Sequence, residues 1–237
     1  MSSDHLHAYP TPAATIEGVA EHLAALIAGN VQATGTCTLA LAGGSTPRAL
    51  YERLAQPDYA ARIPWPNVQV YWGDERCVGP ADPKSNYSMA RSALLDHVPV
   101  EPDHVHPMRG DLDPAEAAEQ YARQLGSDPL DIVLLGMGSD GHTASLFPRG
   151  VELNVDTPTA HSQSPIPPTD RITLSLACIN RAHQVIFLIT GAAKAQRYQE
   201  VRAQLRLPIA PSTLPAARVR PRSGPAHWFG DHDALGS

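Results

Sequence analysis

The stretch "DIVLLGMGSDGHTASLF", residues 131–147, joins a short apolar run directly to a glycine-rich loop. Such a run is typical of a strand that is buried on both faces of a parallel sheet. The three glycines have the G-x-G-x-x-G spacing of a dinucleotide-binding turn, but residues 148–168 lack the helix and second strand that this site requires. Two interpretations remain: a plain tight turn, or a loop that presents Asp140 and His142 to a ligand.

The same order of strand, loop and helix recurs on both sides of this stretch. Apolar runs predict strands at 36–42, 68–72, 131–136, 171–177 and 184–190. Helical periodicity predicts helices at 16–30, 47–54, 85–96, 114–125 and 192–205. Strands that are apolar throughout and separated by helices favour an α/β fold, with an open, mostly parallel sheet and helices on both faces. We expect a single domain over residues 1–237, with residues 1–12 as a mobile N-terminal tail.

Local signals predict where three of these helices begin or end. Gly29 and Asn30 form a plausible stop for the first helix. Thr46 is the candidate N-cap of the second helix, because Pro47 suits the first helical position. Ser85 is placed to cap the third helix.

Composition limits the classes of partner and compartment. The chain of 237 residues has a net charge of -6 and a pI near 6.0, which gives no general attraction to nucleic acid or anionic membranes. The three cysteines form no C-x-x-C pair and are typical of a reducing compartment. The first residues do not have the pattern of a secretory leader, and no run of eighteen apolar residues occurs. We expect a cytoplasmic protein that binds neither nucleic acid nor a membrane.

Ligands of open α/β sheets bind beyond the carboxyl ends of the strands. This rule selects four loops, at residues 43–46, 73–86, 136–146 and 190–194. The first loop resembles a phosphate cradle, because its small residues let backbone N–H groups and two hydroxyls approach an anion at the start of a helix. Plain helix capping is the alternative for this loop.

Charged and titratable residues on the other three loops fit the same site. An imidazole changes protonation near neutral pH, so His142 can take a proton from water and return it to a leaving oxygen. Asp140 can fix the tautomer of that imidazole and stabilise its protonated form. Arg76 and Lys194 follow two other strands and can hold a phosphate. The alternatives are a surface ion pair at residues 74–76 and a solvated helix lysine.

Six segments that cover most of the chain together resemble the 6-phosphogluconolactonase family, which is related to glucosamine-6-phosphate deaminases. They occur in the order of the family and are "LALAGGSTPRALYERL" (39–54), "VYWGDERCVGPADPKSNYSMA" (70–90), "LDIVLLGMGSDGHTASLFP" (130–148), "RITLSLACIN" (171–180), "FLITGAAKA" (187–195) and "LPAARVRPRSGPAHWF" (214–229).

The resemblance implies a fold of modified Rossmann type and hydrolysis of 6-phosphoglucono-δ-lactone to 6-phosphogluconate in the pentose phosphate pathway. It implies no cofactor and no metal; His104 and His106 have strand spacing but lack a third metal ligand. His142 matches the catalytic base and Asp140 its neighbour. The predicted substrate- and phosphate-binding residues are Gly43, Gly44, Ser45, Thr46, Asp74, Arg76, Gly138, Arg171 and Lys194. The expected partner is a sugar phosphate, and the expected state is a monomer or homodimer.

Two departures from relatives bear on the activity. The related deaminases carry D-G-H-I-A-F-N-E-P, whereas this chain has "DGHTASLFP" and so lacks the acid that assists their histidine. This favours the lactonase over the deaminase. Lactonases often have a lysine where this chain has Ile166, which alters the sugar contacts expected near that loop. A sugar-phosphate sensor is the non-enzymatic alternative, because fold alone does not fix function.

Overall fold

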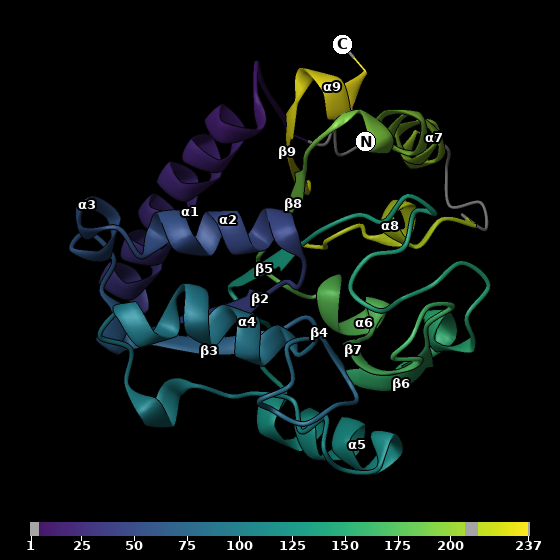
Figure 1. Cartoon of the computed structure of the whole chain (residues 1–237), viewed down its shortest axis with the longest axis horizontal. Coiled ribbons are helices and arrows are strands. Elements are labelled where there is room, and N and C mark those ends of the chain that lie inside the picture. The colour runs from purple at the N-terminus through teal and green to yellow at the C-terminus, as the bar shows by residue number, and fades with distance from the viewer. Residues whose placement is uncertain (1–4, 207–212, 237) are drawn as a thin grey trace.

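Six parallel strands form the central sheet of the computed structural model, which describes residues 5–206 and 213–236 (Figure 1). In spatial order they are β1 (His5–Tyr9), β9 (His227–Asp231), β8 (Gln184–Ile189), β5 (Ile132–Leu135), β2 (Cys37–Leu41) and β3 (Val68–Trp72). Every pair of neighbours is parallel. All four residues of β5 are buried, as are nearly all residues of β2 and β8. The predicted open, mostly parallel α/β sheet is confirmed.

A second, smaller sheet was not expected from the sequence. Its three antiparallel strands are β4 (Asp74–Arg76), β7 (Asp170–Leu174) and β6 (Thr159–Gln163), with β7 in the middle. The predicted strand at 171–177 is therefore shorter and lies outside the central sheet. Ser175 ends it by capping α6 (Leu176–Ile179), where its hydroxyl accepts the N–H of Cys178 at 3.1 Å. Because β7 is almost wholly buried, its apolar run resembles that of a parallel strand.

Helices cover both faces of the central sheet. Figure 1 shows α1 (Pro12–Thr34) and α2 (Ser45–Leu54) on one side and α7 (Ala195–Leu205) and α8 (Pro215–Arg218) on the other. The other α-helices are α3 (Pro57–Ala60), α4 (Asn86–Ala93), α5 (Pro114–Leu125) and α9 (His232–Leu235). Short 3-10 turns are η1 (Trp65–Asn67), η2 (Leu95–His97), η3 (Pro102–His104), η4 (Val151–Asn154) and η5 (Ala192–Lys194).

The ends of α1 differ from the prediction. The helix begins at Pro12, where the Thr11 side chain caps it by accepting the N–H of Ala14 at 3.2 Å. It passes through the expected stop at residues 29–30, because a single glycine inside a helix costs only about 1 kcal/mol. It ends at Gly35, whose φ of +88° is the left-handed conformation that glycine adopts readily.

The caps of α2 and α4 test two further predictions. Thr46 is not the N-cap of α2, because the helix already begins at Ser45 and Gly44 occupies the cap position. The cap at Ser85 is confirmed, since its hydroxyl accepts the N–H of Ser88 at 3.1 Å. A glycine cap leaves the start of α2 without a side chain over it, and this end faces the site described below.

Residues 5–12 are part of the fold, which corrects this part of the expected mobile tail over residues 1–12. β1 pairs in parallel with β9, and its residue Tyr9 packs so closely on α1 that a Cβ at Gly18 would lie 2.2 Å from the tyrosine ring. Residues 1–4 of the expected tail lie outside the described residues. One cluster of buried apolar side chains extends from Ile16 to Leu235, which is consistent with the predicted single domain.

Candidate active site

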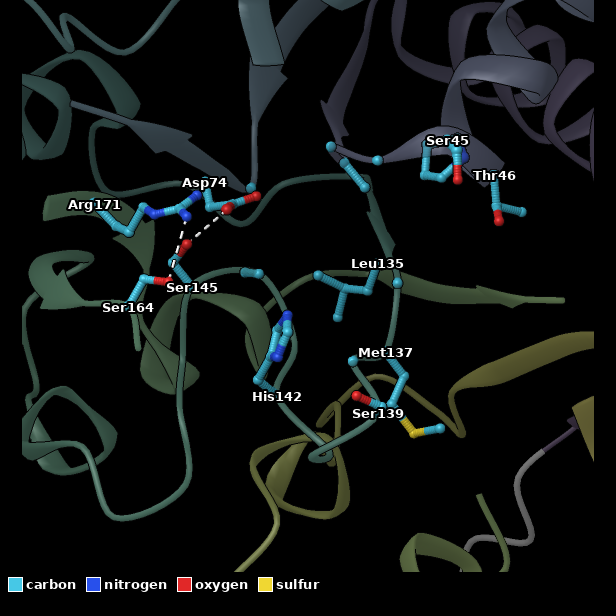
Figure 2. Close-up of a pocket in the computed structure, with 18 of the residues that line it drawn as sticks. Ser45, Thr46, Asp74, Leu135, Met137, Ser139, His142, Ser145, Ser164 and Arg171 are labelled. Atoms are coloured by element: carbon cyan, nitrogen blue, oxygen red, sulfur yellow. Dashed lines mark hydrogen bonds between the residues drawn. The ribbon is translucent and has the colours of Figure 1, made fainter. Parts of the chain in front are cut away.

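A cavity of about 990 Å³ opens at the carboxyl ends of β2, β3, β5 and β8, where the sheet topology predicts a ligand site. Residues from all four predicted loops line it, and Figure 2 shows part of this wall. The predicted site residues on its wall are Gly43, Gly44, Ser45, Thr46, Asp74, Arg76, Gly138, Asp140, His142, Arg171 and Lys194. The fold thus brings every predicted site residue to one cavity.

The loop after β5 holds an imidazole against a carboxylate. Nδ1 of His142 lies 2.6 Å from Oδ1 of Asp140, and the same oxygen accepts the backbone N–H of His142 at 3.1 Å. Burial alone would raise the pKa of Asp140, but the hydrogen bond and charge of His142 hold that pKa at about 2. Because ionised Asp140 can only accept, it favours a proton on Nδ1 and leaves Nε2 as the basic nitrogen.

Glycine makes room for this pair. A Cβ at Gly138 would lie 2.1 Å from Nδ1 of His142 and 2.7 Å from Oδ1 of Asp140, so a larger residue would displace both side chains. After the loop the chain forms a tight turn, in which the N–H of Leu146 donates to the carbonyl of Thr143 at 2.9 Å. This differs from the strand, turn and helix of a dinucleotide site and supports the interpretation that the loop presents His142.

The loop after β2 packs against neighbouring loops of the cavity. A Cβ at Gly43 would fall 2.1 Å from Oδ1 of Asn86, so this close approach requires glycine. Oγ1 of Thr46 lies 2.9 Å from Oγ1 of Thr190, which joins the loop to the end of β8. Among the described residues no side chain caps α2, so the N–H groups of Ser45 and Thr46 in its first turn can bind an anion, as a phosphate cradle requires, whereas Pro47 has no N–H.

Three of the four cationic side chains that line the cavity were predicted, namely Arg76, Arg171 and Lys194; the fourth is Lys84. Arg76 and Arg171 lie opposite each other in the β4–β7 pair, and Lys194 is contributed by η5. In the part of the chain that the structure describes, none of the three forms a salt bridge, and Nε of Arg76 is buried without a hydrogen-bond partner. Burial and the charge of Arg76 lower the pKa of Arg171, and burial lowers the pKa of Lys194. These uncompensated charges favour an anionic ligand.

The alternative of a surface ion pair at residues 74–76 does not agree with the structure. Glu75 is buried, and its carboxylate accepts the backbone N–H groups of Asn86 and Tyr87 at 2.7 and 2.8 Å. Burial raises the pKa of Glu75 despite these hydrogen bonds. Glu75 therefore accepts N–H groups at the start of α4 and forms no salt bridge with Arg76.

The wall also holds polar residues that were not predicted, and two of them, Ser145 and Ser164, contact predicted site residues. The hydroxyl of Ser145 donates to Oδ2 of Asp74 at 2.7 Å, and Arg171 donates to Oγ of Ser164 at 3.3 Å, as the dashed lines in Figure 2 show. Ser145 lies within the glycine-rich stretch, but its partner is 71 positions away, so no local pattern indicates the contact. Ile166 also lines the cavity and is 69 % exposed, in the place where relatives often have lysine.

Other candidate features lie apart from the cavity. His106 contacts the side chains of Gln69 and Gln124 at 2.6 and 3.0 Å. Across residues 5–206 and 213–236, no group of His, Cys, Asp and Glu is arranged to hold a metal ion. Over the same residues, none of the helices combines the length and the apolar character that crossing a membrane requires.

Comparison with known proteins agrees with the geometry. The sequence model of the family described as "Glucosamine-6-phosphate isomerases/6-phosphogluconolactonase" matches residues 10–228. A 6-phosphogluconolactonase of Aggregatibacter actinomycetemcomitans is 34 % identical over 200 residues, covering 83 % of this chain and 85 % of the relative. A 6-phosphogluconolactonase of Nostoc sp. is 42 % identical over 183 residues, covering 72 % of this chain and 73 % of the relative. The expected enzyme class, a lactone hydrolase, agrees with these names.

Solved structures give the same result. The 6-phosphogluconolactonase from Trypanosoma brucei has a TM-score of 0.86 at 28 % identity, covering 100 % of this chain and 99 % of that one. The one from Thermotoga maritima has a TM-score of 0.85 at 27 % identity, covering 97 % and 100 %. A monomeric glucosamine-6-phosphate deaminase shares the fold, with a TM-score of 0.81 at 21 % identity. The chain therefore belongs to the glucosamine-6-phosphate isomerase/6-phosphogluconolactonase family.

Proposed function

We propose that this protein hydrolyses 6-phosphoglucono-δ-lactone to 6-phosphogluconate, with His142 as the general base. The observation that carries the proposal is the pairing of His142 with ionised Asp140 on the wall of a cavity whose four Lys and Arg side chains form no salt bridge with any described residue. The names of the relatives support the substrate. The replacement of the deaminase acid by the apolar segment "LFP" at 146–148 favours lactone opening over deamination.

The chemistry needs one proton to be taken and returned. Nε2 of His142 removes a proton from water as the water oxygen attacks the lactone carbonyl carbon. Asp140 stabilises the imidazolium that forms. The tetrahedral intermediate then expels the ring oxygen, which receives the proton from Nε2, and the ring opens to a carboxylic acid and a hydroxyl. At neutral pH the acid ionises, so each turnover releases one proton to solvent.

The phosphate end of the substrate is assigned to the cationic part of the cavity. Arg76, with its unpartnered Nε, and Lys194 can give directed donors and point charge to a phosphate. The free N–H groups at the start of α2 can add backbone donors. Anchoring the phosphate away from the lactone ring holds the carbonyl beside the water that His142 activates.

The test follows proton release from freshly generated 6-phosphogluconolactone, with buffer alone as the background. His142→Ala should lower kcat by about 10²–10⁴-fold, which is the usual contribution of general base catalysis, with little change in KM. His183→Ala is the matched control, because His183 is exposed and does not line the cavity. A wild-type rate equal to the buffer rate would overturn the proposed lactonase activity. In that case, ammonia release from glucosamine 6-phosphate would indicate a deaminase, and no ammonia release would indicate a sugar-phosphate sensor.

A second variant separates binding from chemistry. Arg76→Ala should raise KM about 10–100-fold and change kcat less, because hydrogen bonds to a charged group are lost in both the ground state and the transition state. Equal effects on KM alone for Arg76→Ala and His142→Ala would contradict the division of roles. The cytoplasmic location and the monomeric or homodimeric state stay predictions from the sequence.

A further inference from the structure

The Asp74 carboxylate is held from the loop that carries His142. Asp74 opens β4 on the cavity wall and is only 7 % exposed. Its Oδ2 accepts the hydroxyl of Ser145 at 2.7 Å, and its Oδ1 has a weaker contact with Nδ2 of Asn86 at 3.3 Å. Among the described residues, no Lys, Arg or His forms a salt bridge with Asp74. The Ser145 hydroxyl is therefore its shortest side-chain contact.

Ser145 is itself fixed by the second sheet. Its N–H donates to Oγ1 of Thr173 on β7 at 3.2 Å, and its carbonyl accepts the hydroxyl of Ser162 on β6 at 2.6 Å. Ser145 is 1 % exposed, so solvent does not compete for its hydroxyl. These contacts leave the Ser145 Oγ one charged acceptor, the carboxylate of Asp74.

We propose that Ser145 is a positioning residue: it turns the Asp74 carboxylate toward the cavity, where Oδ1 accepts hydrogen bonds from hydroxyl groups of the bound sugar. Figure 2 shows Asp74, Ser145 and Arg171 together on one wall of the cavity. A carboxylate whose second oxygen is occupied by a fixed donor presents its remaining lone pairs in one direction. Sugar hydroxyls are donors that match such an acceptor. This proposal rests on the proposed function, because it needs a polyhydroxylated ligand in the cavity.

The first experiment compares Ser145→Ala with Ser175→Ala. Ser175 is equally buried and its hydroxyl also makes a hydrogen bond, but it lies in the cap of α6 away from the cavity lining. We measure KM for the lactone, thermal unfolding, and affinity for the product 6-phosphogluconate by calorimetry. Ser145→Ala should raise KM and weaken product binding about ten-fold each, as expected for a lost hydrogen bond to a charged group. Ser175→Ala should change unfolding alone, and Ser145→Thr, which keeps the hydroxyl, should recover part of the affinity.

A double-mutant cycle with Asp74→Ala tests whether Ser145 acts through Asp74. If it does, Ser145→Ala should have no further effect on KM or product affinity in the Asp74→Ala background. The same ten-fold loss in both backgrounds would overturn the positioning role and leave the proposed function intact. A wild-type protein that neither opens the lactone nor binds 6-phosphogluconate would overturn the proposed function, and this proposal with it.

Discussion

The histidine in the cavity and a group of histidines near the N-terminus differ in whether a carboxylate contacts the imidazole. In the cavity, the His142 imidazole lies 2.6 Å from the carboxylate of Asp140. Far along the sheet, β1, β9 and α1 pack imidazoles against one another. We call this group the N-terminal histidine cluster; its members are His5, His7, His22 and His227.

The N-terminal histidine cluster has no carboxylate partner among residues 5–206 and 213–236. Nε2 of His7 lies 3.1 Å from Nδ1 of His227, and the rings of His22 and His227 have centroids 4.9 Å apart. Within the described ranges, no Asp or Glu forms a hydrogen bond or salt bridge with any of the four. The buried Asp231, also on β9, accepts backbone N–H groups of Gly191 and Ala234 instead. Among the described residues, the cluster is therefore held by stacking of the rings, burial and the His7–His227 hydrogen bond, without a carboxylate.

These surroundings have opposite electrostatic effects. Burial, followed by the neighbouring imidazoles, lowers the pKa of His7, of His22 and of His227, the last to about 4. In the cavity, the hydrogen bond from His142 outweighs burial and holds the pKa of Asp140 at about 2. Histidines are thus kept neutral in the N-terminal histidine cluster, whereas His142 in the cavity has an ionised carboxylate as its partner. The proposed base, His142, differs from the histidines of the cluster in having a carboxylate partner.

Removing that carboxylate should lower activity more than any change in the N-terminal histidine cluster. Asp140→Asn keeps the shape of the side chain, but its amide can donate to Nδ1 and so favour the tautomer with a protonated Nε2. We expect kcat for the lactone to fall about 10–100-fold, with KM little changed. In contrast, His22→Leu in the cluster should keep kcat within about two-fold. Comparable losses for the two variants, measured by proton release, would contradict the distinction between the sites.

Acid should destabilise the fold through the cluster. Because the folded pKa values of His7, His22 and His227 lie below their unfolded values near 6.5, the unfolded chain binds more protons between these limits. The free energy of unfolding should therefore fall as pH drops from about 6.5 toward 4, by about 1–2 kcal/mol after allowance for partial exposure. Urea unfolding at a series of pH values measures this slope.

Matched variants assign that slope to the cluster. Replacing His7, His22 and His227 together by Gln should flatten the dependence in this window, whatever its effect on stability at pH 7. His183→Gln removes an exposed histidine and should keep the wild-type slope. An unchanged slope in the triple variant would show that other groups take up the protons.

The sequence predicts the elements that have a local hydrophobic pattern. It does not predict the strand pairs and side-chain contacts that join residues far apart in the chain. The parallel sheet and its four loops follow from apolar runs that are continuous over four to seven residues, such as "DIVLL". The sequence of β1 does not indicate a buried strand, because "HLHAY" has polar residues on the face that packs against α1, and its pairing with β9 depends on a segment more than 200 residues away. The contact of Ser145 with Asp74 was missed because a three-dimensional neighbour 71 positions away leaves no periodic signal.

Another histidine, His161, also pairs with a carboxylate, and its replacement should have the smallest effect on activity. His161 on β6 lies 2.8 Å from Asp170, and both side chains are as exposed as those of the cavity pair, at 34 % and 43 %. Neither residue lines the cavity. His161→Gln should therefore cost less than about 1 kcal/mol in urea unfolding and leave kcat unchanged, as for an exposed ion pair. A fall in kcat comparable to that of Asp140→Asn would mean that pairing with a carboxylate, without a place on the cavity wall, is sufficient for a catalytic role.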